Sequence, residues 1–436
     1  MVKNEIVRFH VRLLLIAAAV GAIAGGAVLA FREPLRAWAY GVTGEEGLAQ
    51  QIKGVAYYAG NLVRPQPRLD DAASKQAGAS KQAGEIHHAD VVPFGINTFL
   101  QQEVEVTKRE RSLQMIRDAG FRWIRQEFPW EDIEIHGKGD FEDRRWEPHR
   151  SAWEKYDNIV DLAGNYGLEI IARLSTPPNW TRAVNNEFSD LWPPDDYADF
   201  GDFVYAVVDR YKGRIRYYQI WNEPNLVREW GVVDAGEYVE LLKVAYTRAK
   251  EADPECVILA GALSATIELD REEWGKGVSD FIYLQQMYDA GAAAYFDIMS
   301  VQGYGLFSGP TNRRMQARVL NFSRPLYIRE IMVLNGDAEK AIWISELDWS
   351  PVPEAITPVY GRYDEETRAR YVVEAYERME KEWPWMGVAC FWFFKRADDS
   401  ERERPEYYFR MVEPDFTPLP VYEAVKAYTA AREGAD

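Results

Sequence analysis

The chain has 436 residues, of which 47% are hydrophobic and 14% aromatic, and this composition is typical of a folded globular protein. Its 69 acidic and 51 basic residues give a formal net charge of −18, which argues against a nucleic-acid partner because phosphate binding requires clustered Lys and Arg. Cys256 and Cys390 are the only cysteines, and both lie in apolar runs. Two cysteines exclude a disulfide framework and a cysteine zinc site, so we expect buried free thiols.

The amino terminus carries a long apolar segment. Residues 13–31 contain no charge and are preceded by Lys3, Arg8 and Arg12. A segment of about 20 apolar residues spans a bilayer as a helix, and basic residues stay on the cytoplasmic side. We therefore predict that residues 1–31 form a membrane anchor and that the rest of the chain is extracytoplasmic. The alternative is a signal peptide, removed by cleavage so that the protein is secreted.

The next segment changes character near residue 65. Residues 32–63 hold an apolar stripe at helical spacing, from Leu48 to Leu62, which predicts a juxtamembrane helix. Residues 65–90 are rich in Ala, Gly, Gln, Lys and Ser and contain a repeated Ser-Lys-Gln-Ala-Gly unit. Such a composition buries too little apolar surface to fold. We assign residues 32–90 to this helix and a flexible linker, and residues 91–436 to the folded body.

The folded body alternates strand-like and helical patterns. Apolar strand-like runs cover residues 93–99, 122–128, 169–174, 216–221, 257–263, 296–301, 341–345 and 387–394. Amphipathic stretches cover residues 108–119, 153–166, 197–211, 235–251, 278–290, 365–383 and 421–431. This alternation implies parallel strands with crossover helices, and eight such units predict a (β/α)8 TIM barrel. The alternative is an open doubly wound sheet, which for nucleotide binding would need a glycine-rich phosphate loop that the sequence lacks.

In a TIM barrel the active site is built from the loops that follow the strands. Polar and aromatic candidates at these positions are Asn97, Arg125, Glu127, Thr176, Asn179, Trp180, Asn222, Glu223, Gln302, Tyr304, Glu346, Asp348, Trp392 and Lys395. No histidine lies on strands three to eight or in the loops after them, which argues against a Ser-His-Asp triad, a Cys-His pair and a histidine-ligated metal. Proton transfer is therefore left to carboxylates.

Glu223 and Glu346 are the two carboxylates that best fit glycoside cleavage. One carboxyl group protonates the leaving oxygen, and a carboxylate on the other side attacks or stabilises the anomeric carbon. Asn222, next to Glu223, can donate a hydrogen bond to the sugar 2-hydroxyl. The alternative is that the pair holds Mg2+ or Mn2+, which would need a third carboxylate such as Asp348 or Glu127.

Further side chains are candidates for supporting this chemistry. Tyr304 can hold the nucleophile through its hydroxyl, and Arg125 can keep that carboxylate ionised. Trp392 and Trp180 offer flat faces to a sugar ring, and Asn97 follows the first strand. Each of these side chains also has a structural alternative in the barrel core. The expected chemistry requires no cofactor.

The motif Trp221–Pro224 resembles the Asn-Glu-Pro signature at the end of strand four in clan A glycoside hydrolases. Ile344–Glu346 resembles the nucleophile motif on strand seven of the same clan. The resemblance covers residues 93–431 and implies that Glu223 is the general acid/base and Glu346 the nucleophile. It also matches Arg125, Tyr304 and Trp392 to the arginine, tyrosine and tryptophan of strands two, six and eight.

Within the clan, residues 176–180 and Trp221–Asn225 look most like family 39, with families 5 and 42 as near alternatives. Family 39 contains β-xylosidases, iduronidases and endo-acting enzymes on bacterial exopolysaccharide. Many clan members place a histidine near the position of Gln302, so this chain departs from the pattern there. The departure leaves the preferred sugar open.

The sequence thus predicts a membrane-anchored, extracytoplasmic, retaining β-glycoside hydrolase that acts on an oligo- or polysaccharide. A non-catalytic carbohydrate-binding or polysaccharide-assembly protein on the same barrel is one alternative. A transglycosylase is another, because only the acceptor of the sugar differs. The sequence predicts neither the sugar and linkage, nor endo or exo action, nor the oligomeric state.

Overall fold

The computed structural model describes residues 32–43, 47–63, 85–183, 191–269 and 275–434. The predicted membrane anchor and residues 64–84 of the predicted linker lie outside these residues. No helix within the described ranges is long and apolar enough to cross a bilayer. The chain divides into two compact units, a helical unit at the amino terminus that includes Thr311–Arg314, and a barrel unit that contains the remaining described residues.

Within the described residues of the helical unit, residues 32–63 form two helices where the sequence pattern predicted one. They are α2 (Arg32–Thr43) and α3 (Leu48–Val63). The helices approach closely because α3 carries Gly54, at which a Cβ atom would lie 2.6 Å from Cγ2 of Thr43. The Thr43 hydroxyl donates to the carbonyl of Ala39, one turn earlier in α2, at 2.6 Å.

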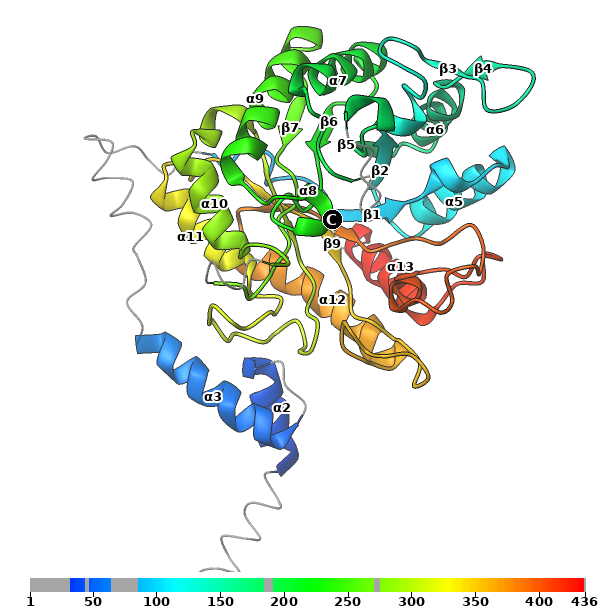
Figure 1. Cartoon of the computed structure of the whole chain (residues 1–436). Coiled ribbons are helices and arrows are strands. Elements are labelled where there is room, and N and C mark those ends of the chain that lie inside the picture. Colours follow the sequence, from blue (N-terminus) through cyan, green and yellow to red (C-terminus); the bar gives the residue numbers. More distant parts are fainter. Residues whose placement is uncertain (1–31, 44–46, 64–84, 184–190, 270–274, 435–436) are drawn as a thin grey trace, which may run out of the picture. The chain divides into compact units, whose positions relative to one another are not determined.

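The barrel unit is built on eight parallel strands (Figure 1). These are β1 (Phe94–Thr98), β2 (Trp123–Pro129), β5 (Glu169–Ser175), β6 (Tyr217–Ile220), β7 (Val257–Leu259), β8 (Met299–Gln302), β9 (Ile342–Leu347) and β10 (Met386–Phe391). Each falls within or overlaps one predicted run. The sheet order is β7-β6-β5-β2-β1-β10-β9-β8, and parallel bridges from Leu259 to Ile298 and from Leu263 to Val301 join its two edges. The predicted (β/α)8 fold is therefore confirmed.

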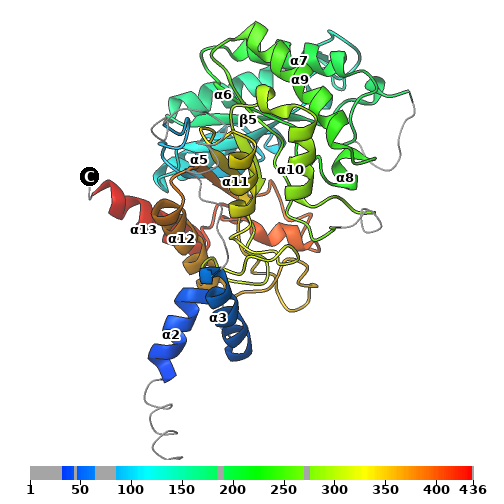
Figure 2. The same ribbon diagram turned by 90° about the vertical axis from the view of Figure 1, so that its left-hand side faces the viewer.

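Helices surround the strands in both views of the ribbon (Figure 1, Figure 2). They are α5 (Val106–Asp118), α6 (Glu154–Asn165), α7 (Tyr197–Tyr211), α9 (Ala235–Ala252), α10 (Asp280–Asp289), α11 (Pro325–Leu334), α12 (Glu365–Glu382) and α13 (Pro420–Glu433). Three of them begin at an aspartate whose side chain accepts hydrogen bonds from the first turn: Asp196, Asp234 and Asp364. These caps explain why α7, α9 and α12 begin where the sequence pattern predicted.

Two further α-helices and two further β-strands were not predicted. Helix α11 begins with a proline, which suits the first turn of a helix. The short helix α8 (Val227–Trp230) follows the Trp221–Asn225 motif directly. The charged loop near residue 145 carries a small antiparallel pair, β3 (Glu142–Asp143) and β4 (Arg150–Ser151).

Aromatic side chains fill the barrel interior near the amino-terminal ends of the strands. Trp123, Tyr217 and Trp343 contact one another with ring centroids 5.0 to 5.1 Å apart. The indole of Trp343 donates to the carbonyl of His88 at 2.9 Å, and that of Trp123 donates to Val92 at 2.8 Å. Residues 85–92 therefore close this end of the barrel, and the carboxyl end of the strands remains for the chemistry.

Both cysteines are buried free thiols, as predicted. Burial raises the pKa of Cys256 and of Cys390 to about 12, so neither forms a thiolate at neutral pH. Cys390 packs against β1 at Gly95, where a Cβ atom would lie 2.7 Å from its sulfur. Its role in the barrel is packing.

Candidate active site

Glu346 lies on β9 at the carboxyl end of the barrel, and every residue of this strand is buried. Each of its two carboxylate oxygens has a donor. Nη1 of Arg125 lies 3.1 Å from Oε1, and the hydroxyl of Tyr304 donates to Oε2 at 2.8 Å. The carboxylate is thereby fixed in orientation. Burial, together with the charge of Glu346, raises the pKa of Tyr304 well above its ordinary value, so the phenol stays protonated and remains a donor.

Glu223 follows β6 in an unusual backbone conformation. The φ angle is +43° at Glu223 and +73° at Trp221, both in the left-handed region that favours glycine. A non-glycine residue there costs about 1–3 kcal/mol, and such residues concentrate at functional sites. Neighbouring strands hold the turn, because the Trp221 amide donates to Leu174 and the Glu223 amide donates to Ala262, each at 2.9 Å. The turn places the Glu223 side chain beside the end of β8.

Asn225, the last residue of the motif, anchors this turn rather than facing the site. Its Nδ2 donates to the carbonyls of Ser264 and Val278, each at 2.8 Å, and its Oδ1 accepts from the Ser264 amide at 2.9 Å. The side chain is fully buried. All of its hydrogen-bonding groups thus serve to tie the Glu223 loop to the loops that follow β7.

Arg125 connects the strand ends across the barrel. Its Nε donates to Gln219, its Nη1 to Asn97 and its Nη2 to the Oδ1 of Asn222, each at 2.8 Å, in addition to the contact with Glu346. Burial lowers the pKa of Arg125 from its ordinary value, whereas the charge of Glu346 raises it. One guanidinium therefore sets the positions of residues from β1, β6 and β9 at once.

The two asparagines of this network differ in what they leave for a ligand. Asn97 donates through Nδ2 to the carbonyls of Ser345 at 2.8 Å and Phe391 at 3.1 Å, so both of its polar atoms are bonded to the protein. Its predicted contact with a sugar would require exchange of one of these bonds. Asn222 accepts from Arg125 through Oδ1, and its Nδ2 donates to no residue in the described part of the chain.

The electrostatic environment of Glu223 favours its protonated form. Burial is the main cause, followed by the negative charges of Glu346 and Glu229, and together they raise its pKa to about 7. Gln302 opposes this by donating through Nε2 to Oε1 of Glu223 at 2.9 Å. The positive charge of Arg228, whose Nη2 lies 3.6 Å from Oε2, opposes it as well. Near neutral pH, Glu223 can therefore both donate and accept a proton.

The predicted aromatic contacts lie in the loops around this end of the barrel. Trp392 follows β10, is half-buried, and meets Phe99 edge to face at 5.6 Å between ring centroids. Trp180 is also half-buried, donates through its indole to the carbonyl of Glu134 at 2.9 Å, and contacts Trp130 edge to face. Stacking of either ring on a sugar stays a prediction.

Three residues of the site were missed from the sequence. Gln219 and Arg173 are polar residues inside otherwise apolar strand runs, and this interruption is the signal that would have found them. Gln219 accepts from Arg125, and Arg173 forms an ion pair with Glu127. The third is Glu229. It was missed because candidates were sought at the ends of strands and in the loops after them, and Glu229 lies on the helix α8.

Asp348 and Glu127, the candidates for a third carboxylate in a metal site, each form an ion pair with an arginine. Asp348 turns away from Glu346 and pairs with Arg368 of α12 at 2.6 Å, with both side chains fully buried. Burial raises the pKa of Asp348 to about 7 although Arg368 opposes this. Glu127 pairs with Arg173. Among the residues that the structure describes, no group of three or more His, Cys, Asp or Glu is arranged to hold a metal ion.

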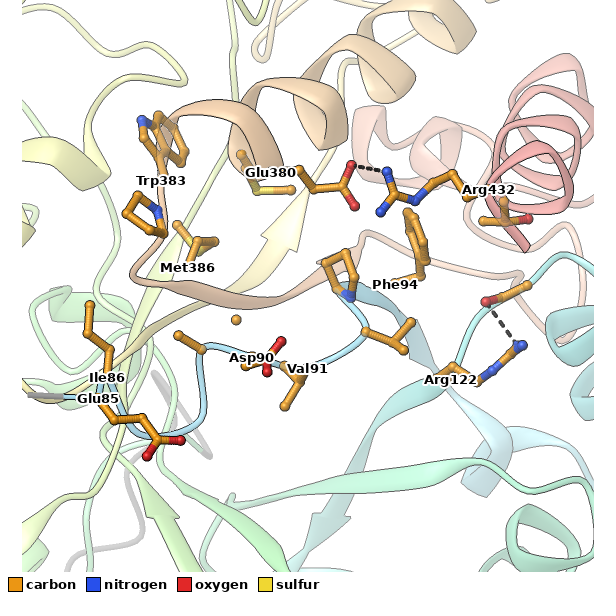
Figure 3. Close-up of a pocket in the computed structure, with 18 residues that line it drawn as sticks. Glu85, Ile86, Asp90, Val91, Phe94, Arg122, Glu380, Trp383, Met386 and Arg432 are labelled. Atoms are coloured by element: carbon orange, nitrogen blue, oxygen red, sulfur yellow. Dashed lines mark hydrogen bonds and ion pairs between the residues drawn. The ribbon is translucent and has the colours of Figure 1, made fainter. Parts of the chain in front are cut away.

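A cavity of about 800 Å³ lies at the other end of the barrel (Figure 3). Its lining includes Phe94 and Met386, the first residues of β1 and β10, and an ion pair between Glu380 and Arg432 at 2.7 Å. Its volume is within the range of ligand pockets, but a second cavity, lined by residues such as Arg145 and Asn158, is slightly larger at about 860 Å³, so size does not single out either place. The paired glutamates and their donors lie at the carboxyl ends of the strands, so we place the candidate active site there.

Comparison with known proteins finds partial sequence matches to glycosidases. No family model matches the chain. Over 101 residues it is 32% identical to a β-xylosidase of Geobacillus stearothermophilus, a match that covers 22% of this chain. The chain spans only 19% of the length of that relative.

Solved structures share the fold over most of the chain. A family 39 glycoside hydrolase from Bacteroides cellulosilyticus superimposes with a TM-score of 0.55 at 19% identity, covering 80% of this chain and 65% of that one. A monomeric β-xylosidase from Caulobacter crescentus gives a TM-score of 0.55 at 17% identity, covering 77% of this chain and 67% of that one. The predicted resemblance to family 39 glycoside hydrolases of clan A is thereby confirmed.

Proposed function

We propose that the protein is a retaining β-glycoside hydrolase in which Glu346 is the nucleophile and Glu223 the general acid/base. The observation that carries this proposal is the contrast between two buried carboxyl groups. Glu346 has a donor on each oxygen, one of them a guanidinium, which suits a carboxylate that attacks. The pKa of Glu223 is raised to about 7, which suits a group that must first give a proton and then take one.

In the first step, an oxygen of Glu346 attacks the anomeric carbon and forms a glycosyl ester. The bond to the leaving oxygen breaks, and that oxygen receives the proton of Glu223. The hydroxyl of Tyr304 keeps the attacking carboxylate in place. The free Nδ2 of Asn222 is suited to donate to the sugar 2-hydroxyl, a bond that strengthens in the transition state.

In the second step, water replaces Glu346 on the sugar. Esterified Glu346 carries no charge, so one of the main causes of the raised pKa of Glu223 disappears in the intermediate. Glu223 then ionises more readily and accepts a proton from the attacking water. The neutral donor Gln302 stays on Glu223 in both steps, because an amide does not titrate.

The proposed substrate class is an O-linked β-glycoside of an oligo- or polysaccharide. The sequence match to a β-xylosidase supports this class, and so do the amides and half-buried indoles around the glutamates. No cofactor enters the proposed reaction. Trp392 and Trp180 are proposed as the faces on which sugar rings stack.

We further propose that the apolar segment at residues 13–31 anchors the enzyme and leaves the barrel extracytoplasmic. Alkaline carbonate extraction of membranes should leave the full-length protein in the pellet. Protease added outside intact cells should digest the barrel. A mature amino terminus near residue 25, found by mass spectrometry, would support the secreted alternative.

The test of the proposed activity uses the full-length protein and a panel of aryl β-glycosides. Glu346→Ala should abolish turnover, whereas Glu223→Ala should retain slow turnover of substrates whose leaving group needs no proton. Proton NMR of the first product should show the β-anomer. Full activity of Glu346→Ala, or release of the α-anomer, would contradict the mechanism.

Incubation with oligosaccharides distinguishes hydrolysis from the two alternative functions. Oligosaccharide binding without product would favour a non-catalytic binding or assembly protein. Longer oligosaccharides formed when a sugar acceptor is added would favour a transglycosylase, in which sugar replaces water in the second step.

A further inference from the structure

Arg228 lies between two carboxylates, one of which is the proposed acid/base. It belongs to α8, which starts directly after the turn that carries Glu223. Its Nη2 donates to Oε1 of Glu229 at 2.9 Å and its Nε donates to the same oxygen at 3.2 Å. The separation between Nη2 and Oε2 of Glu223 is 3.6 Å, too long for a hydrogen bond. Between these two carboxylates, the guanidinium therefore hydrogen-bonds to Glu229 and keeps only a longer ion pair with Glu223.

The position of Glu229 is itself fixed. Its side chain is only 8% exposed, whereas that of Arg228 is 68% exposed. Its backbone carbonyl accepts from the indole of Trp221 at 3.1 Å, which ties α8 to the motif that carries Glu223. Burial raises the pKa of Glu229, and the charges of Arg228 and Arg173 oppose this rise by stabilising its ionised form.

We propose that Glu229 is a positioning residue that keeps Arg228 hydrogen-bonded away from Glu223 and so preserves the proton-donating form of the acid/base. This inference rests on the proposed role of Glu223. It gives helix α8 a part in controlling the protonation of Glu223.

Glu229 affects the pKa of Glu223 in two ways, and both raise it. A guanidinium hydrogen-bonded to Glu223 would stabilise its carboxylate and lower its pKa, and Glu229 prevents this contact. The negative charge of Glu229 also disfavours a second negative charge at Glu223 and contributes to the raised pKa. Loss of Glu229 would therefore lower the pKa of Glu223, and loss of Arg228 alone would raise it.

Other groups that face Glu223 are not expected to mimic this effect. Glu346 contributes from β9, and Tyr304 and Tyr360 lie within electrostatic reach from the loops after β8 and β9. The pKa of each tyrosine is raised above its ordinary value, so both stay neutral near pH 7. Gln302 does not titrate. Glu346 is unchanged in every variant proposed below.

The experiment measures kcat/KM of an aryl β-glycoside against pH for the full-length enzyme, Glu229→Gln, Arg228→Met and the double variant. The basic limb of this profile reports loss of the proton from the free acid/base. Glu229→Gln should move the limb to lower pH by about one unit, because a charge within hydrogen-bonding distance shifts a pKa by about 1–3 units. Arg228→Met should move it to higher pH, and the double variant should lie between the two.

Two outcomes would overturn the inference. One is a Glu229→Gln enzyme whose rate falls equally at every pH with an unmoved limb, as a purely structural role would cause. The other is an unmoved or lowered limb in Arg228→Met, which changes an exposed side chain and should fold normally.

A second readout does not depend on activity. In protein labelled with ¹³C at glutamate carboxyl carbons, the Glu223 resonance is identified by its absence in Glu223→Gln, and its titration gives the pKa directly. The pKa of Glu223 should be lowest in Glu229→Gln, intermediate in the unchanged protein and highest in Arg228→Met. If no glycoside is cleaved but this order is found, the proposed function fails and the positioning role stands. An unchanged or raised pKa in Glu229→Gln would contradict the role even in an active enzyme.

Discussion

Nη1 of Arg125 lies 3.1 Å from Oε1 of Glu346, and both side chains are buried. Arg125→Lys keeps the charge but replaces five planar N–H donors with a point ammonium, which cannot reach Asn97 and Asn222 as well. A hydrogen bond to a charged group contributes about 1.5–3 kcal/mol, so kcat/KM should fall by about 10- to 100-fold. Steady-state kinetics on an aryl β-glycoside measure this.

The matched control for Arg125 is Arg368→Lys. Arg368 is also fully buried and paired with a carboxylate, but its partner Asp348 lies off the site. This variant should lose thermal stability and keep its kcat. Unchanged kcat/KM in Arg125→Lys would rule out the proposed part of the guanidinium in holding the nucleophile.

Tyr304→Phe removes the hydroxyl that donates to Oε2 of Glu346. Loss of this bond should lower kcat by about 10-fold, since hydrogen bonds to charged groups contribute about 1.5–3 kcal/mol. Tyr376→Phe is the comparison, because its buried hydroxyl donates to the carbonyl of Ala389 at 3.0 Å. It should lower the melting temperature and leave kcat unchanged. Equal effects of the two variants on kcat would mean that Tyr304 only packs.

Glu223→Gln should make the protein more stable at high pH. The pKa of Glu223 is about 7 in the folded chain and lies near the ordinary 4.5 when unfolded, so the folded state binds more protons between these values. Stability is therefore full below pH 4.5 and declines as pH rises through 7. A pKa difference from 4.5 to 7 corresponds to a loss in the free energy of unfolding on the order of 3 kcal/mol. The Glu223→Gln protein does not undergo this loss, because an amide does not ionise.

Calorimetric melting temperatures from pH 4 to pH 9 test this. The variant and the unchanged protein should differ little at the acid end, diverge between about pH 4.5 and pH 7, and keep a constant difference at higher pH. A constant difference across the range would show that the ionisation of Glu223 does not limit stability.

Asp348→Asn should lower stability and spare catalysis. The carboxylate and Arg368 are fully buried, so removal of one charge leaves the other without its partner at a cost of about 3–5 kcal/mol. The exposed pair of Asp157 and Arg210 serves as control, because Asp157→Asn should cost less than about 1 kcal/mol. Loss of turnover in folded Asp348→Asn that added Mg2+ restores would instead favour the metal alternative.

The barrel could be predicted because its signals are local. Eight apolar runs separated by amphipathic stretches follow directly from burial on both faces of a parallel strand. The positions of Glu223 and Glu346 at strand ends follow from the same pattern. Helix α11 was missed although Pro325 at its first position is a signal typical of a helix start.

The partners of the site residues could not be predicted, because they depend on contacts between distant strands. Glu346 and Asp348 are two residues apart, and along a continued strand both would face one side. Strand β9 ends at Leu347, so the chain turns and Asp348 meets Arg368 instead. The choice of Glu229 over Glu223 as the partner of Arg228 likewise depends on how α8 is placed.

The hydrogen bonds of Arg125 reach β1, β6 and β9, and β6 and β9 are separated by β7 and β8 in the closed barrel. A slip of either strand by one residue would turn its side chains away from the guanidinium. Catalytic competence should therefore appear during refolding only when all strands have reached their final register. Recovery of turnover is then a stricter test of barrel assembly than recovery of the helical circular dichroism signal. Turnover should return in the last kinetic phase of refolding.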